Sequence, residues 1–138
     1  MNEYRFEDLV VGTQESFSET LTEEKMEAFL TITGDTNPLH RDKEFACQHG
    51  YADCVVYGML SASLFSTLAG VYLPGKYCLI QQVEAKFVAP VYVGDELTVL
   101  GIVKEKNETV RQVVLKVEIR NQKGEKVVRG TMNIGFLE

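Results

Sequence analysis

The spacing of hydrophobic residues predicts an amphipathic helix early in the chain. Met26, Phe29 and Leu30 stand at i, i+3 and i+4, so they share one helix face. Thr22 is a suitable N-cap, because its hydroxyl can accept a hydrogen bond from a free backbone N–H of the first turn. Gly34 is expected to end the helix. This helix should pack one side against the core and leave the other in solvent.

Two further helices are expected in the same half of the chain. Asp42 can cap a short helix that runs to about Cys47. From Gly58 to about Tyr72 the chain carries no charged residue, and apolar residues occupy nearly all sides of the predicted helix. A helix with no polar face is buried. Pro74 follows this segment and cannot continue it.

The second half of the chain has the pattern of β-strands. Runs rich in Val, Ile, Thr and Phe alternate with turn residues, which predicts strands at 78–89, 95–105, 109–121 and 125–136, besides a short edge strand at 15–20. The intervening turns, such as Gly94-Asp95 and Lys123-Gly124, are short and therefore join antiparallel neighbours. We expect an α+β fold in which a curved antiparallel sheet wraps around the long buried helix.

Composition and charge narrow the functional classes. The 138 residues, of which 45% are hydrophobic, suit a single domain spanning 1–138. The net charge of −6 argues against nucleic-acid binding, which relies on a basic face. No apolar run approaches the ~18 residues of a membrane span, and Met1–Arg5 does not resemble a secretory signal. We therefore expect a cytoplasmic protein that binds neither nucleic acid nor membrane.

The three cysteines do not suggest a disulfide or a metal site. Cys47, Cys54 and Cys78 are odd in number and unevenly spaced, as expected of reduced thiols. Cys47, His49 and Cys54 lack the paired Cys-x-x-Cys spacing of structural zinc sites. We expect no metal.

The candidate chemistry is concentrated in the segment Thr33-Gly34-Asp35-Thr36-Asn37-Pro38-Leu39-His40. Pro38 has a fixed φ and biases Asn37 away from helical geometry, so the chain should turn sharply here. The Asp35 carboxylate and the His40 imidazole, five positions apart, can then converge on one water molecule. The backbone N–H of Gly58, at the start of the buried helix, is a candidate donor to a developing oxyanion.

This segment resembles the Ser/Thr-Gly-Asp-x-Asn-Pro-x-His motif of the MaoC-like hydratases, the (R)-specific enoyl-CoA hydratase/dehydratase branch of the hotdog fold. The resemblance continues through Val55–Met59 and Pro90–Asp95. It implies a single hotdog domain that adds water reversibly, with syn geometry, to a trans-2-enoyl thioester. The implied partner is an acyl-CoA, with acyl carrier protein as an alternative carrier. The resemblance further implies a homodimer or a dimer of dimers and no cofactor, since coenzyme A belongs to the substrate.

The resemblance also assigns roles to individual residues. Asp35 and His40 correspond to the catalytic pair, with Asp35 as the base toward water, and the Gly58 N–H to the oxyanion donor. Other positions are expected at the substrate: Asn37 as organiser of the loop, Ser66 as a site hydroxyl, Tyr57 and Met59 beside Gly58, and Ala69 in the acyl tunnel. The family usually has His where this sequence has Tyr57.

Two other functions are compatible with the same fold. A hotdog thioesterase would direct water onto the thioester carbonyl instead of the β-carbon. A non-catalytic accessory protein would bind the acyl thioester without converting it. The Asp35…His40 spacing favours the hydratase, because thioesterases of this fold typically lack this loop.

Overall fold

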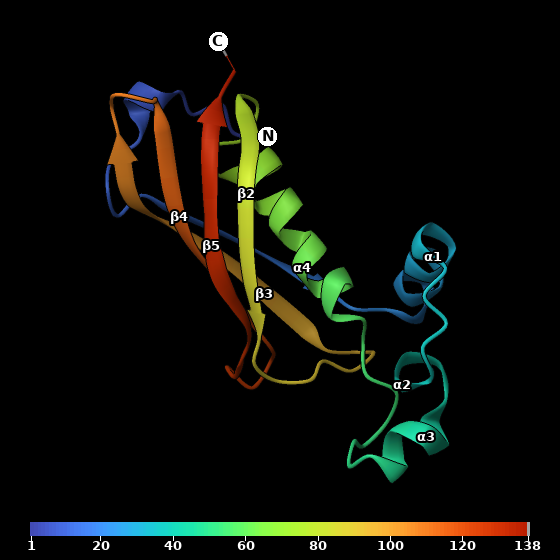
Figure 1. Ribbon diagram of the computed structural model, residues 1–138. Helices are drawn as coiled ribbons and strands as arrows, with labels where there is room; N and C mark the ends of the chain where they lie inside the picture. The colour runs from blue at the N-terminus through green and yellow to red at the C-terminus, as the bar shows by residue number, and fades with distance from the viewer. Residues whose placement is uncertain (138) are drawn as a thin grey trace.

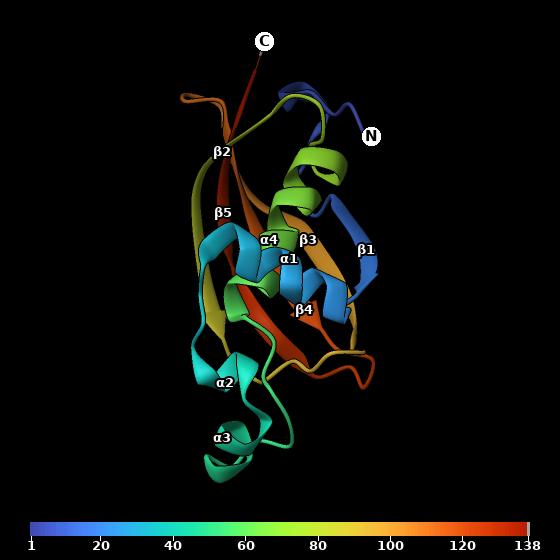
Figure 2. The ribbon, with the colours of Figure 1, turned by 90° about the vertical axis from the view of Figure 1, so that its right-hand side faces the viewer.

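A computed structural model describes residues 1–137 as one antiparallel sheet with a helix across one face (Figure 1). The strands are β1 (Gln14–Thr20), β2 (Cys78–Phe87), β3 (Glu96–Asn107), β4 (Gln112–Arg120) and β5 (Lys126–Phe136). Their order in the sheet is β1-β3-β4-β5-β2, with every neighbouring pair antiparallel. Figure 2 shows β1 and β2 flanking the long helix, so that the sheet curves around it as the sequence predicts.

The helices are α1 (Glu23–Thr33), α2 (Pro38–Arg41), α3 (Lys43–Gln48) and α4 (Gly58–Thr67). A 3-10 turn, η1 (Phe6–Asp8), precedes β1, and a π-helical turn, η2 (Leu68–Tyr72), continues α4. Helices α1, α2 and α3 lie together beyond the end of α4 that carries Gly58 (Figure 1). None of the helices within residues 1–137 is long and apolar enough to cross a membrane.

The core forms where α4 and η2 meet the sheet. Phe65 and Leu68 are 1% and 0% exposed. On β3 and β4 buried and more accessible positions alternate, because successive side chains of a strand point to opposite faces. The helix approaches β3 closely at Gly101, where a Cβ would come within 2.9 Å of a Leu68 methyl carbon. Glycine at this position therefore lets η2 lie directly on the sheet.

The predicted helix ends are confirmed by side-chain caps. Thr22 Oγ1 accepts from the Lys25 N–H at 3.3 Å, and Asp42 Oδ1 accepts from the Phe45 N–H at 3.1 Å. Gly34 ends α1 with φ of 69°, a left-handed conformation that glycine adopts without strain.

The largest differences from the prediction are an additional helix and a later start of β4, whereas the other strand ends differ by one or two residues. Pro38 begins an additional short helix, α2, because Asn37 Oδ1 caps it by accepting from the Leu39 N–H at 2.9 Å. Strand β4 begins at Gln112 instead of 109, because Asn107 Oδ1 accepts from the N–H groups of Thr109 and Val110 and closes a turn there.

Candidate active site

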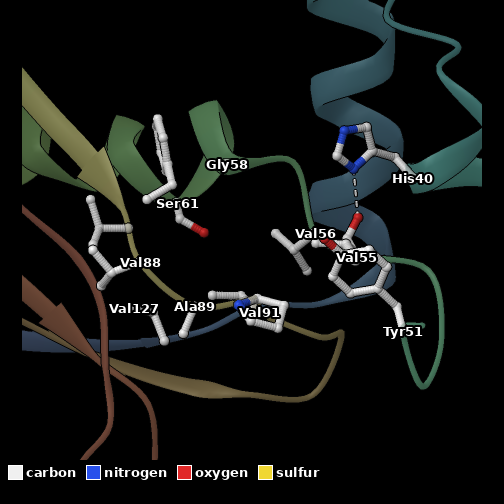
Figure 3. A pocket seen from close by; sticks show the side chains of 13 residues that line it. His40, Tyr51, Val55, Val56, Gly58, Ser61, Val88, Ala89, Val91 and Val127 are labelled. Atoms are coloured by element: carbon white, nitrogen blue, oxygen red, sulfur yellow. Dashed lines mark hydrogen bonds between the residues drawn. The ribbon is translucent and has the colours of Figure 1, made fainter. Parts of the chain in front are cut away.

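His40 lies at the end of α2 with its imidazole in a defined tautomer. Its Nδ1 is 2.7 Å from the Val55 carbonyl oxygen (Figure 3). A carbonyl can only accept, so Nδ1 carries the proton and donates it to Val55. The neutral ring then has an unprotonated Nε2, which can accept a proton from a ligand or water. The half-buried His40 side chain lines a cavity of about 330 Å³.

Asp35 lies in the loop between α1 and α2, where local bonds shape the main chain. Its Oδ1 accepts from the Asn37 N–H at 3.0 Å, and its own N–H donates to Thr33 Oγ1 at 3.2 Å. Its carbonyl oxygen accepts from the Tyr57 hydroxyl at 2.7 Å. Asp35 is half-buried and does not line the cavity beside His40. The two members of the predicted pair are linked through Tyr57.

Tyr57 is buried next to His40 and does not line the cavity. Its side chain is 1% exposed, and its ring centroid is 4.3 Å from that of His40 and 4.8 Å from that of Phe29. Burial raises the pKa of the Tyr57 phenol, an effect that the neighbouring Arg41 guanidinium opposes. The phenol therefore remains a hydrogen-bond donor at neutral pH. The structure brings Tyr57 to the predicted acid–base pair, not to the substrate cavity.

Gly58 is the first residue of α4 and lines the same cavity as His40. The first N–H groups of an α-helix have no acceptor within the helix, and the helix dipole favours negative charge beside them. A Cβ at Gly58 would come within 3.0 and 3.1 Å of two Phe87 ring carbons. Glycine thus accommodates the ring of Phe87 at this wall of the cavity.

Most of the cavity wall is apolar and comes from the loop before α4 and from the strand ends (Figure 3). The lining residues are His40, Tyr51, Val55, Val56, Gly58, Ser61, Phe87, Val88, Ala89, Pro90, Val91, Val127 and Val128. An apolar cavity with a few converging polar groups is the usual form of a small-molecule site. Its composition suits an acyl chain.

Ser61 is a cavity residue that the sequence analysis missed. It is 1% exposed, and within residues 1–137 no group forms a hydrogen bond with its Oγ. By contrast, Ser63 Oγ donates to the Leu60 carbonyl at 2.6 Å, as helical serines commonly do. The available signal was spacing: Ser61 follows Gly58 by three positions and shares its helix face.

Several predicted substrate contacts lie away from this cavity. Met59 is 66% exposed and Ser66 is also exposed. These residues are seven positions apart and therefore share one exposed face of α4, and neither lines the cavity. Ala69 is 0% exposed within the core. Asn37 is exposed and caps α2, as expected of a residue that organises the loop. The roles of Met59, Ser66 and Ala69 in substrate binding stay predictions.

The described residues contain no obvious metal-binding cluster. Within 1–137, no group of three or more His, Cys, Asp and Glu side chains could hold a metal ion. Cys47, Cys54 and Cys78 are free thiols. Burial raises the pKa of the Cys78 thiol to about 11, so it is protonated and unreactive at neutral pH.

Comparison with known proteins identifies relatives of this chain. The chain is 36% identical over 124 residues to an (R)-specific enoyl-CoA hydratase of Aeromonas caviae, which covers 90% of this chain and 92% of that protein. It is 35% identical over 105 residues to an (R)-specific enoyl-CoA hydratase of Rhodospirillum rubrum, covering 73% of each.

Solved structures extend the likeness to the fold. The (R)-hydratase of A. caviae involved in PHA biosynthesis matches with a TM-score of 0.88 at 35% identity, over 94% of this chain and 98% of that one. The unliganded R-hydratase PhaJ1 of Pseudomonas aeruginosa matches with a TM-score of 0.88 at 30% identity, over 96% of this chain and 85% of that one. These matches confirm the expected hotdog fold. Because the model of the MaoC-like domain matches residues 8–127, the chain belongs to the MaoC-like domain family.

Proposed function

We propose that this protein is an (R)-specific enoyl-CoA hydratase, which reversibly adds water to a trans-2-enoyl thioester. The observation that carries the proposal is the apolar cavity bounded on one side by the His40 imidazole and on another by the first residue of α4, Gly58. A proton acceptor and an oxyanion donor at one apolar cavity are the two requirements of this reaction. The named relatives in A. caviae and R. rubrum support the same activity.

In the proposed mechanism Asp35 and His40 hold one water molecule. Asp35 acts as the base toward this water. The Nε2 of His40 is unprotonated, because Nδ1 carries the proton that is donated to Val55, and it accepts a hydrogen bond from the second O–H of the water. The water oxygen bonds to the β-carbon while the C=C electron pair moves toward the thioester. The Gly58 N–H stabilises the negative charge on the thioester oxygen. The pair then returns a proton to the α-carbon on the same face, which completes syn addition.

We further propose a homodimer joined along β2. This strand lies at an edge of the sheet and exposes large hydrophobic side chains, among them Leu79 at 45%, Val83 at 47% and Phe87 at 51%. The other edge strand, β1, exposes only polar residues. An exposed apolar edge invites pairing with another strand. Phe87 also lines the cavity, so a partner along β2 would lie beside its mouth.

Substrate hydration tests the function directly. The purified chain is incubated with crotonyl-CoA, loss of the enoyl absorbance is followed, and the product is resolved on a chiral column. We expect (R)-3-hydroxybutyryl-CoA without release of free thiol. Thiol release with the enoyl absorbance intact would instead identify a thioesterase. A panel of enoyl thioesters on coenzyme A and on acyl carrier protein, varied in chain length, defines the substrate.

Single substitutions test the acid–base pair. Asp35→Asn and His40→Gln should each lower kcat by at least about 10²-fold without unfolding the chain. His49→Gln is the matched control, because the exposed His49 likewise bonds a carbonyl, that of Phe45, at 2.8 Å. Wild-type turnover in either folded site variant would refute the assignment.

A further inference from the structure

We propose that Tyr57 is a positioning residue that holds Asp35 and His40, the two members of the acid–base pair, at fixed positions relative to the start of α4. The inference rests on the proposed hydratase function and adds to it a residue with no direct contact to substrate. Tyr57 is the N-cap residue of α4, so the next peptide carries the Gly58 N–H. Its side chain reaches from there to both Asp35 and His40.

The first contact fixes the loop that carries Asp35. The Tyr57 hydroxyl donates to the Asp35 carbonyl oxygen at 2.7 Å, across 22 positions of sequence. The two other hydrogen bonds of Asp35 go to Thr33 and Asn37, each two residues away. Within residues 1–137, the phenol is thus the only hydrogen-bonding group distant in sequence that holds Asp35. Local bonds shape this loop, but the phenol sets its position relative to α4.

The second contact supports the imidazole of His40. The rings of Tyr57 and His40 lie 4.3 Å apart with an interplanar angle of 32°, while Nδ1 is held by the Val55 carbonyl. The Tyr57 ring also packs on Phe29 of α1 at 4.8 Å. With 1% of its surface exposed, the phenol is closely packed by its neighbours. One buried side chain therefore contacts α1, the Asp35 loop and α2.

The ring and the hydroxyl have separable effects. Phenylalanine at position 57 retains the packing on His40 and Phe29, whereas it loses the bond to Asp35 and the interaction of the hydroxyl with the neighbouring Arg41. Small misplacements of catalytic groups lower the rate much more than they lower substrate binding. We expect Tyr57→Phe to lower kcat for crotonyl-CoA by about 10- to 100-fold and to change KM by less than about 2-fold.

Two variants separate positioning from a general loss of structure. Tyr4→Phe is the matched control, because it removes a tyrosine hydroxyl that donates to Glu15 at 2.8 Å, apart from the cavity. It should leave kcat unchanged. A 4-aminophenylalanine incorporated at position 57 keeps an N–H donor at the same place on the ring. It should recover most of the lost kcat.

Amide hydrogen exchange supplies a readout independent of activity. In Tyr57→Phe, exchange should quicken in residues 34–41 and remain unchanged in β3 and β4. Wild-type kcat in Tyr57→Phe, or no recovery with the amino analogue, would overturn the positioning role while leaving the hydratase proposal intact. Inactivity of the wild-type chain toward all enoyl thioesters would refute the hydratase proposal, and the exchange measurement would still test the Tyr57 contact.

Discussion

Replacing Ser61 with alanine is expected to stabilise this fold. The Ser61 hydroxyl is buried, and within residues 1–137 it has no hydrogen-bond partner. A buried polar group without a partner costs about 1–3 kcal/mol relative to its hydration in the unfolded chain. Alanine removes this cost, loses one oxygen atom of packing and has the better helix propensity. We expect a net gain of about 1–2 kcal/mol.

The gain can be expressed as a melting temperature. Unfolding entropy is about 2.1 cal/mol/K per residue, or roughly 0.29 kcal/mol/K for a chain of this length. A gain of about 1–2 kcal/mol then raises Tm by about 3–7 °C, measured by calorimetry on the ligand-free protein. Ser63→Ala is the matched control, since the exposed Ser63 hydroxyl already bonds Leu60, and its Tm should change by less than about 2 °C. An unchanged or lower Tm in Ser61→Ala would refute the reasoning.

Three further outcomes are expected. Gly58→Ala should lower kcat by about 10²-fold, because the added methyl group would lie about 3.0 Å from the Phe87 ring and displace the start of α4 that carries the N–H. Steady-state hydration of crotonyl-CoA measures the effect, and wild-type kcat would show that the exact placement of this N–H does not limit the reaction. Val83→Lys should convert the proposed dimer to a monomer, because it places a charge on the apolar edge of β2. Light scattering measures the mass of the variant and of the wild type, and a dimeric variant would contradict the proposed interface. Burial raises the pKa of Glu118, but hydrogen bonds and charge from Lys126 and Arg120 outweigh burial and lower it overall. Glu118→Gln should therefore lower the free energy of unfolding, measured by urea titration above pH ~4.3. The difference in this free energy between variant and wild type should disappear as pH falls through the lowered pKa of Glu118, and a difference that persists at pH 2 would refute the linkage.

Local information was enough to predict most elements of this fold, although not the short helix α2. The cap at Thr22, the left-handed end at Gly34 and the uncharged segment after Gly58 depend on neighbours within a few residues, so their residue types alone indicate helix starts, stops and burial. The same holds for the alternating strands and for the local turn between Asp35 and Asn37. The motif also singled out His40, and the start of the buried helix singled out Gly58; the structure places both on one cavity.

Only the tertiary structure decided which side chains share that cavity. Phe87 and Val127 come from strands far from His40 in sequence, and nothing in their own neighbourhoods indicates a cavity. Ser61 and Ser66 are both helical serines, yet the direction in which the sheet covers α4 buries the first and exposes the second. Tyr57 contacts Asp35 across 22 positions, a distance closed by the packing of α1 and α2 near the start of α4. Local sequence determines where elements begin and end, whereas long-range packing determines which of their faces meet.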